Sequence, residues 1–228
     1  MRLFLFDIDG TLIKSGGAGR KSLDATFKEF YGLDNASKGI DPHGKTDPII
    51  MREIFMKKLG RKPSDYELNK VFGRYLDYLE HFISKLDGYE VLPGVPQFLE
   101  TLIKRNSLLG LATGNVERGA KIKLAPSGLL KYFSFGGYSS DSEIRTEIVR
   151  IAIERGKRKA AQMGEKVSYI YVVGDTHHDI ICAKEVNAIS VAVATGVYSE
   201  EKLLEYSPDF VFKNFSNIEE LIFKLGLS

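Results

Sequence analysis

The N-terminal segment MRLFLFDIDGTLI constrains the fold more than any other part of the chain. Residues 2–6 are almost wholly apolar, a pattern typical of a strand that is buried on both faces of a parallel sheet. Asp7 and Asp9 follow directly, and alternate residues of an extended chain point to the same side. Gly10 then allows the backbone to turn sharply. We therefore expect two carboxylates at the carboxyl end of a central strand, where open α/β sheets bind ligands.

Such a pair of carboxylates suits the transfer of a phosphoryl group. A carboxylate attacks an anionic phosphate only when a cation such as Mg²⁺ shields the charge repulsion between them. Asp7 is then the candidate nucleophile, which would form an aspartyl-phosphate. Asp9 is the candidate general acid and base. The motif DxDG is short, and taken alone it is equally consistent with a simple turn after a strand.

Composition bears on the class of protein. Of the 228 residues 43% are apolar, which is enough for a globular core, either as one large domain or as a core with an insertion. The net charge of +2 gives no argument for a nucleic-acid or membrane partner.

The single cysteine, Cys182, excludes an internal disulfide, and its apolar neighbours predict a buried thiol. Without a run that resembles a signal peptide or a membrane span, we expect a cytoplasmic protein.

The pattern of apolar residues predicts two domains. Residues 15–89 are helical in pattern, with helices expected at 47–59 and 64–86. Beyond them strands and helices alternate, which requires a parallel sheet with right-handed crossovers. We therefore predict an α/β, Rossmann-like parallel sheet core formed by residues 1–14 and 90–228. Residues 15–89 are predicted to be inserted into it as a helical cap domain.

Polar residues follow three of the predicted strands. Asp7 and Asp9 end the first strand, Thr113-Gly114-Asn115 ends the second and Asp175 ends the fourth, with Asp179 one helical turn further on. Because parallel strands bring these ends to one edge of the sheet, we expect the residues to converge there. The predicted strands are residues 2–6, 108–112, 133–138, 169–173, 189–194 and 210–212.

Each of these polar groups has a task in phosphoryl transfer. The Thr113 hydroxyl and the accessible N–H groups around Gly114 can hold phosphoryl oxygens, whereas a plain turn would leave Asn115 as a helix cap. Asp175 is placed to ligate a cation. Asp179 binds the ion or orders its waters, or else is an ordinary acid in the first turn of a helix.

A phosphate among carboxylates also needs a fixed positive group. Arg145 is the first choice, because it begins a long helix that enters near the expected active edge and because arginine binds phosphate well. Lys123 is the alternative. His177 and His178 are adjacent on a helix and diverge by about 100°, so they cannot both face one metal ion. We expect them to be solvated or to lie at the edge of the substrate site.

Taken together, these segments resemble the haloacid dehalogenase-like hydrolase superfamily, in particular its phosphoglycolate phosphatase-like and β-phosphoglucomutase-like branch. The resemblance covers essentially the whole chain, including the inserted helical cap and the basic residue before the fourth strand. Its motifs are DIDGTL at residues 7–12, LATGN at residues 111–115 and VVGDTHHD at residues 172–179.

The resemblance implies roles for individual residues. Asp7 is the implied nucleophile, Asp9 the acid and base, and Thr113 a phosphate ligand. The GKTD segment at residues 44–47 is implied to be a cap loop that faces the site, which makes Lys45 a candidate for substrate recognition. The family usually has a Lys, often before Pro, where this chain has Arg145 before Thr146. The expected phosphate-binding and substrate-binding set is Gly10, Lys45, Thr113, Gly114, Asn115 and Arg145, and the expected Mg²⁺ ligands are Asp7, Asp175, Asp179 and the backbone carbonyl of Asp9.

The function that follows is hydrolysis of a small phosphorylated metabolite by a Mg²⁺-dependent phosphatase, through an aspartyl-phosphate. A phosphomutase, which returns the phosphoryl group to a sugar, is the alternative. A non-catalytic phosphate-binding protein is disfavoured because binding alone does not require Asp9. Asp9 also argues against a true dehalogenase, which has no alkoxide to protonate. We expect a monomer or a homodimer.

Overall fold

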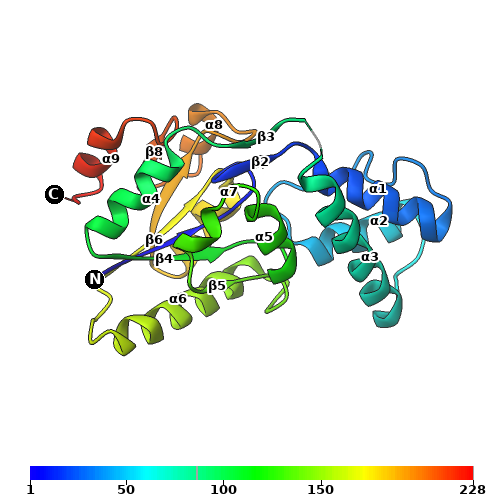
Figure 1. Ribbon diagram of the computed structural model, residues 1–228, viewed down its shortest axis with the longest axis horizontal. Coiled ribbons are helices and arrows are strands. Elements are labelled where there is room, and N and C mark those ends of the chain that lie inside the picture. Colours follow the sequence, from blue (N-terminus) through cyan, green and yellow to red (C-terminus); the bar gives the residue numbers. More distant parts are fainter. Residues whose placement is uncertain (86, 228) are drawn as a thin grey trace.

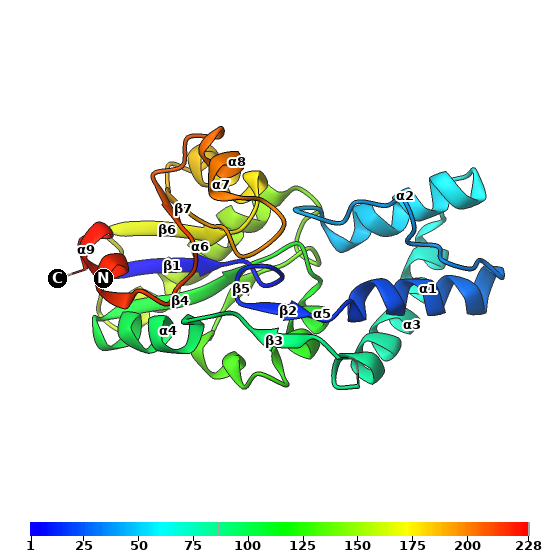
Figure 2. The same ribbon diagram turned by 90° about the horizontal axis from the view of Figure 1, so that it is seen from above.

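The strand β1 (Arg2–Phe6) lies at the centre of a six-stranded parallel sheet with the order β5-β4-β1-β6-β7-β8. The computed structural model describes residues 1–85 and 87–227. β1 pairs in parallel with β4 on one side and β6 on the other, so the carboxyl ends of these strands meet at one edge (Figure 2). The other strands of the sheet are β4 (Ser107–Ala112), β5 (Gly136–Gly137), β6 (Tyr169–Gly174), β7 (Ile189–Val193) and β8 (Phe210–Phe212).

Helices cover both faces of this sheet, as the predicted α/β, Rossmann-like core requires (Figure 1). Phe4 and Phe6 of β1 point to the face covered by α4, α5 and α9, and Leu3 and Leu5 point to the face covered by α6 and α7. Cys182 of α7 is buried on the second face, as predicted. The helices of the core are α4 (Val95–Lys104), α5 (Glu117–Leu124), η1 (Leu129–Tyr132), α6 (Arg145–Gln162), α7 (His177–Glu185), α8 (Glu200–Leu204) and α9 (Ile218–Lys224).

Three further helices form a group of their own beyond the carboxyl ends of the strands (Figures 1 and 2). They share a hydrophobic cluster whose most buried members include Phe27, Met51, Phe55 and Val71. Two short antiparallel strands connect this group to the core. The helical group corresponds to the predicted cap, and the exact limits of that domain stay a prediction. The elements are β2 (Ile13–Ser15), α1 (Ala18–Tyr31), α2 (Asp47–Leu59), α3 (Asp65–Ile83) and β3 (Tyr89–Val91).

The predicted elements agree closely with the observed ones where local signals are strong. α2 has the predicted bounds, and α3 begins after Ser64, whose hydroxyl accepts a hydrogen bond from the Glu67 N–H in a capping box. α3 ends at Ile83, earlier than the predicted residue 86, which lies outside the described residues. No helix in the described part of the chain has both the length and the apolar character to cross a membrane.

Two strand predictions were wrong in detail. No strand is predicted between residues 6 and 108, but β2 and β3 pair there, and three-residue strands are too short to show an alternating pattern. The predicted strand at 133–138 is reduced to two paired glycines, because the chain turns away at Tyr138. In that turn the Tyr138 N–H donates to the Asp141 carboxylate at 3.1 Å.

Phe98 of α4 offers a test of how the helical layer is anchored to the sheet. Its ring is 1% exposed and lies 5.1 Å from that of Phe215 and 6.4 Å from those of Phe4 and Phe6, centroid to centroid. Phe98→Ala is expected to lower the free energy of unfolding by about 3–5 kcal/mol, measured by urea denaturation. Phe223→Ala, at a side chain 81% exposed, is the matched control and should change it by less than about 0.5 kcal/mol. Equally small losses in both variants would contradict this account.

Candidate active site

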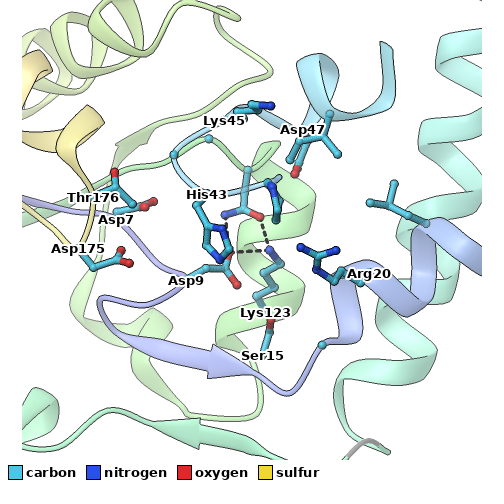
Figure 3. A pocket seen from close by; sticks show the side chains of 18 of the residues that line it. Asp7, Asp9, Ser15, Arg20, His43, Lys45, Asp47, Lys123, Asp175 and Thr176 are labelled. Carbon is cyan, nitrogen blue, oxygen red and sulfur yellow. Dashed lines mark hydrogen bonds and ion pairs between the residues drawn. The ribbon is translucent and has the colours of Figure 1, made fainter. Parts of the chain in front are cut away.

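Three buried aspartates lie together at the edge of the sheet where the parallel strands end. Asp7 follows β1, Asp175 follows β6 and Asp179 lies in the first turn of α7. One carboxylate oxygen from each lies within 4.8 Å of the other two, and the residues are 7%, 2% and 3% exposed. Figure 3 shows Asp7 and Asp175 on the same wall of the pocket. The fold thus brings together acids that are far apart in the sequence.

Burial and repulsion within the cluster raise the pKa values of Asp7 and Asp175. Burial, together with repulsion from Asp179, raises the pKa of Asp7 to about 6, although Arg145 and the Thr113 hydroxyl act in the opposite direction. Burial also raises the pKa of Asp175 well above its usual range, and Asp179 and Asp7 add to this effect. A divalent cation would relieve the repulsion, and carboxylate oxygens are the ligands that Mg²⁺ and Ca²⁺ prefer. The donor set therefore fits such an ion.

Arg145 is the positive group beside the cluster. It is the first residue of α6, its guanidinium donates to Asp179, and its Nη2 lies 3.7 Å from Asp7 Oδ2. Asp179 also accepts hydrogen bonds from the Thr176 N–H at 3.1 Å and the Thr176 hydroxyl at 2.7 Å. Asp179 is therefore both a helix-capping acid and a member of the cluster, so the two roles considered from the sequence are not exclusive.

Asp9 lies outside this cluster and is paired with a second cation. Lys123 Nζ donates to Asp9 Oδ2 and to Asn115 Oδ1, both at 2.6 Å, and Figure 3 shows these contacts. Burial acts to raise the pKa of Asp9, but Lys123, Asn115 and Ser15 outweigh it and lower the pKa below its usual value. Arg145 and Lys123 thus pair with different acids. The site contains both of the cations that were predicted as alternatives.

Asn115 connects these groups to the end of β4. Its Nδ2 donates to Asp9 Oδ2 at 3.1 Å and to the buried Thr113 Oγ1 at 2.9 Å. The N-cap of α5 is Val116, so Asn115 is not the cap that the plain-turn interpretation requires. TGN therefore forms part of a polar network in the pocket.

Two glycines of the expected binding set lie where a side chain has no room. Gly10 has a φ of 79°, and a Cβ there would collide with the Asp175 carboxylate. At Gly114 a Cβ would collide with the Lys45 carbonyl and lie 3.1 Å from the Arg145 guanidinium. Gly10 thus allows its loop to lie against Asp175, and Gly114 allows the end of β4 to lie against the cap loop and Arg145.

The cap forms the opposite wall of a cavity of about 230 Å³ (Figure 3). Lys45 lines it from the loop before α2, and its Nζ is paired with Glu53 at 2.6 Å. Asp47 links the cap to the core: its N–H donates to the Gly114 carbonyl at 2.8 Å, and its carboxylate accepts from the Val116 N–H at 2.9 Å. Burial raises the pKa of Asp47 to about 6, with Lys123 and the Val116 N–H opposing.

Some pocket residues are absent from the predicted set. Lys123 is predicted only as an alternative to Arg145. The predicted set of site residues lacks Arg20, Asp47 and Tyr75, which also line the cavity. For Lys123 a signal exists, because it shares a buried helical face with Ala120 and Leu124, where a charged residue is unusual. Asp47 ends the GKTD segment, which the family resemblance implies to face the site. Arg20 and Tyr75 reach the pocket through the packing of the cap on the core, which no local pattern reports.

The sequence is similar to a known protein family and to curated proteins over most of its length. The model of a family described as haloacid dehalogenase-like hydrolase matches residues 4–193. Pyrophosphatase PpaX of Oceanobacillus iheyensis is 26% identical over 226 residues, which cover 97% of each chain. A phosphoglycolate phosphatase of Synechococcus elongatus is 25% identical over 232 residues, 99% of each chain.

Solved structures share the fold. A hydrolase from Pseudomonas syringae has a TM-score of 0.74 at 19% identity, over 99% of both chains. A β-phosphoglucomutase from Clostridium difficile has a TM-score of 0.74 at 18% identity, over 99% of this chain and 97% of that one.

The buried carboxyl of Asp47 predicts a pH dependence of stability. An acid whose pKa is raised by folding binds its proton more tightly in the folded state, so it stabilises the fold at low pH, and this contribution is lost as the pH rises through about 6. Between about pH 4 and pH 7 the natural protein should therefore lose about 3 kcal/mol more stability than Asp47→Asn, which has no proton to release. Urea denaturation at several pH values, with a chelator present, measures the difference. Parallel pH curves for the two proteins would refute the prediction.

Proposed function

The chain belongs to the haloacid dehalogenase-like hydrolase family, and we propose that it is a Mg²⁺-dependent phosphatase that acts on a small phosphomonoester in the cytoplasm. The observation that carries the proposal is the separation of the acids into two groups. Asp7, Asp175 and Asp179 form a buried cluster suited to a cation, and Asp9 stands apart beside Lys123. The relatives named as a pyrophosphatase and a phosphoglycolate phosphatase support release of phosphate as the activity.

Asp7, Asp175 and Asp179 are the side chains that would hold the ion, with the backbone carbonyl of Asp9 as a fourth ligand implied by the family resemblance. When bound, Mg²⁺ would screen the charge of the phosphate and orient it beside Asp7. Arg145, whose guanidinium is 11% exposed and lies between Asp7 and Asp179, would neutralise further charge on the phosphoryl oxygens.

Asp7 is the proposed nucleophile. Its carboxylate oxygen would form a bond to phosphorus while the bond from phosphorus to the leaving alkoxide breaks, which gives an aspartyl-phosphate. The Thr113 hydroxyl, which acts to lower the pKa of Asp7, and the N–H groups at Gly114 would hold the phosphoryl oxygens as their charge shifts.

Asp9 is the proposed general acid and base. It would donate a proton to the leaving alkoxide and then take one from the water that attacks the aspartyl-phosphate. Lys123 and Asn115 lower the pKa of Asp9, which by itself disfavours the protonated form. An anionic substrate beside Asp9 acts in the opposite direction, because like charge raises the pKa of a carboxyl. Substrate binding would thus help to load the proton that the first step consumes.

The cap would exclude bulk water during the reaction. Its contacts with the core lie next to the proposed catalytic groups: Asp47 bonds to the backbone at Gly114 and Val116, between Thr113 and the helix that carries Lys123. A substrate held between cap and core would therefore meet the nucleophile on one side and the cap loop on the other.

Asp7→Asn is the direct test of the nucleophile. Hydrolysis of every substrate found in a screen of phosphorylated metabolites should fall by about 10³-fold or more, because an amide cannot form the acyl phosphate. Release of inorganic phosphate measures the activity, and formation of an isomeric sugar phosphate instead would identify a phosphomutase. Asp34→Asn, at an exposed acid of the cap, is the control and should be fully active. Turnover retained in Asp7→Asn would refute the mechanism.

Removal of the metal gives a test that does not depend on turnover. Mg²⁺ at about 100 times its dissociation constant should raise the free energy of unfolding by about 2.7 kcal/mol, and a chelator should reverse this and abolish activity. Asp175→Asn should lose the Mg²⁺-dependent rise in melting temperature, whereas Asp34→Asn should keep it. An unchanged rise in Asp175→Asn would contradict the proposed ligand set.

A further inference from the structure

Five basic side chains line the cavity between cap and core. Two come from the core, and three, including Arg20 of α1, come from the cap. Four of the five are already paired with an acid. These pairs are Lys45 with Glu53, His43 with Asp41 and Lys123 with Asp9, each at 2.6 Å, and Arg145 with Asp179.

Arg20 differs from the other four. Its Nη2 donates to the Ile40 carbonyl at 3.3 Å, and within residues 1–85 and 87–227 it forms no ion pair with a carboxylate. A guanidinium has five N–H donors in a fixed planar fork, so most of its hydrogen-bonding capacity is left for a ligand. Figure 3 shows the side chain reaching from α1 into the pocket, toward the side where Asp9 and Lys123 lie.

The helix fixes this orientation. Arg20 and Leu23 are three residues apart on α1, and both line the cavity, while Phe27, one turn further on, is buried in the cap cluster. α1 and α3 lie close together here, since a Cβ at Gly19 would be in ordinary van der Waals contact, at 3.7 Å, with the hydroxyl of Tyr75, which also lines the cavity. The packing of α1 against α3 therefore places Arg20 beside the cavity, and its exposed side chain has no acid as a partner among the described residues.

We propose that Arg20 binds a second anionic group of the substrate, a carboxylate or a phosphate, at the end remote from the phosphoryl group that is transferred. The inference rests on the proposed function, in which Asp7, Arg145 and the metal site take the transferred group. The planar fork of arginine matches either anion with two parallel hydrogen bonds. The cavity of about 230 Å³ limits the distance between the two groups to a short linker. The substrate class is thus a small phosphate compound with anions at both ends.

The test compares substrates that carry a second anion with substrates that lack it. Phosphoglycolate is paired with 2-hydroxyethyl phosphate to probe a carboxylate, and pyrophosphate is paired with methyl phosphate to probe a second phosphate. Arg20→Gln should lower kcat/KM for the doubly anionic member of one pair on the order of 10- to 100-fold, and for its partner by less than about 3-fold. Arg20→Lys should restore part of the loss, because it keeps the charge without the fork.

Arg74→Gln is the matched control. It removes one positive charge from the cap at a residue of α3 that pairs with Glu29 and does not line the cavity, so both members of each pair should keep their rates. A purely structural role for Arg20 would slow both members of a pair equally. The inference would be overturned by that result, or by an Arg20→Gln variant in which the ratio of kcat/KM between the two members of each pair is unchanged.

The same assay separates this inference from the proposed function. Suppose that the natural protein hydrolyses these substrates and Asp7→Asn does not, while Arg20→Gln leaves the ratio of kcat/KM between the two members of each pair unchanged. That result would refute the role of Arg20 and leave the proposed function intact. If the natural protein hydrolyses no phosphomonoester and behaves like Asp7→Asn, both the proposed function and the role of Arg20 are refuted. A loss confined to the phosphoglycolate pair or to the pyrophosphate pair would identify the second anion.

Discussion

The confinement of three carboxylates in a buried space is the constraint on which the rest of the structure depends. Asp7, Asp175 and Asp179 repel one another, and burial adds to the cost of their charges. The fold supports them with rigid neighbours: the two central strands β1 and β6 fix two of the acids, and α7 fixes the third. Arg145, at the start of α6, supplies the opposing charge. α6 and α7, which cover the same face of the sheet, therefore each contribute a residue to the site as well as to the core.

A second network links this chemistry to the position of the cap. Lys123 donates to Asp9, and its charge also acts on the buried Asp47 of the cap, which in turn bonds to the backbone beside Thr113. Movement of the cap would carry Asp47 away from Lys123. Asp9 would then be the main acid beside Lys123. In the proposed mechanism, closure of the cap would thus act on the ionisation of Asp9 through Lys123.

The sequence predicts the core of this arrangement because the relevant signals are local. An apolar run followed by Asp7 and Asp9 specifies a strand end, and the same pattern recurs at Thr113 and Asp175. Parallel topology then implies that these ends meet. Contacts that depend on two separate elements packing together have no such signal. The ribbon formed by β2 and β3 is one example, and the approach of Arg20 to the pocket is another.

The contrast between paired and unpaired cations also bears on where specificity resides. Most basic side chains around the cavity are paired with an acid, which offsets the cost of burying their charge. Arg20 gains little from its one contact with the Ile40 carbonyl, and no acid of the described chain offsets its charge. Its hydrogen-bonding capacity is therefore available to whatever enters the pocket. The core would then determine which bond is broken, and a single turn of α1 would determine which molecule is held there to be cleaved.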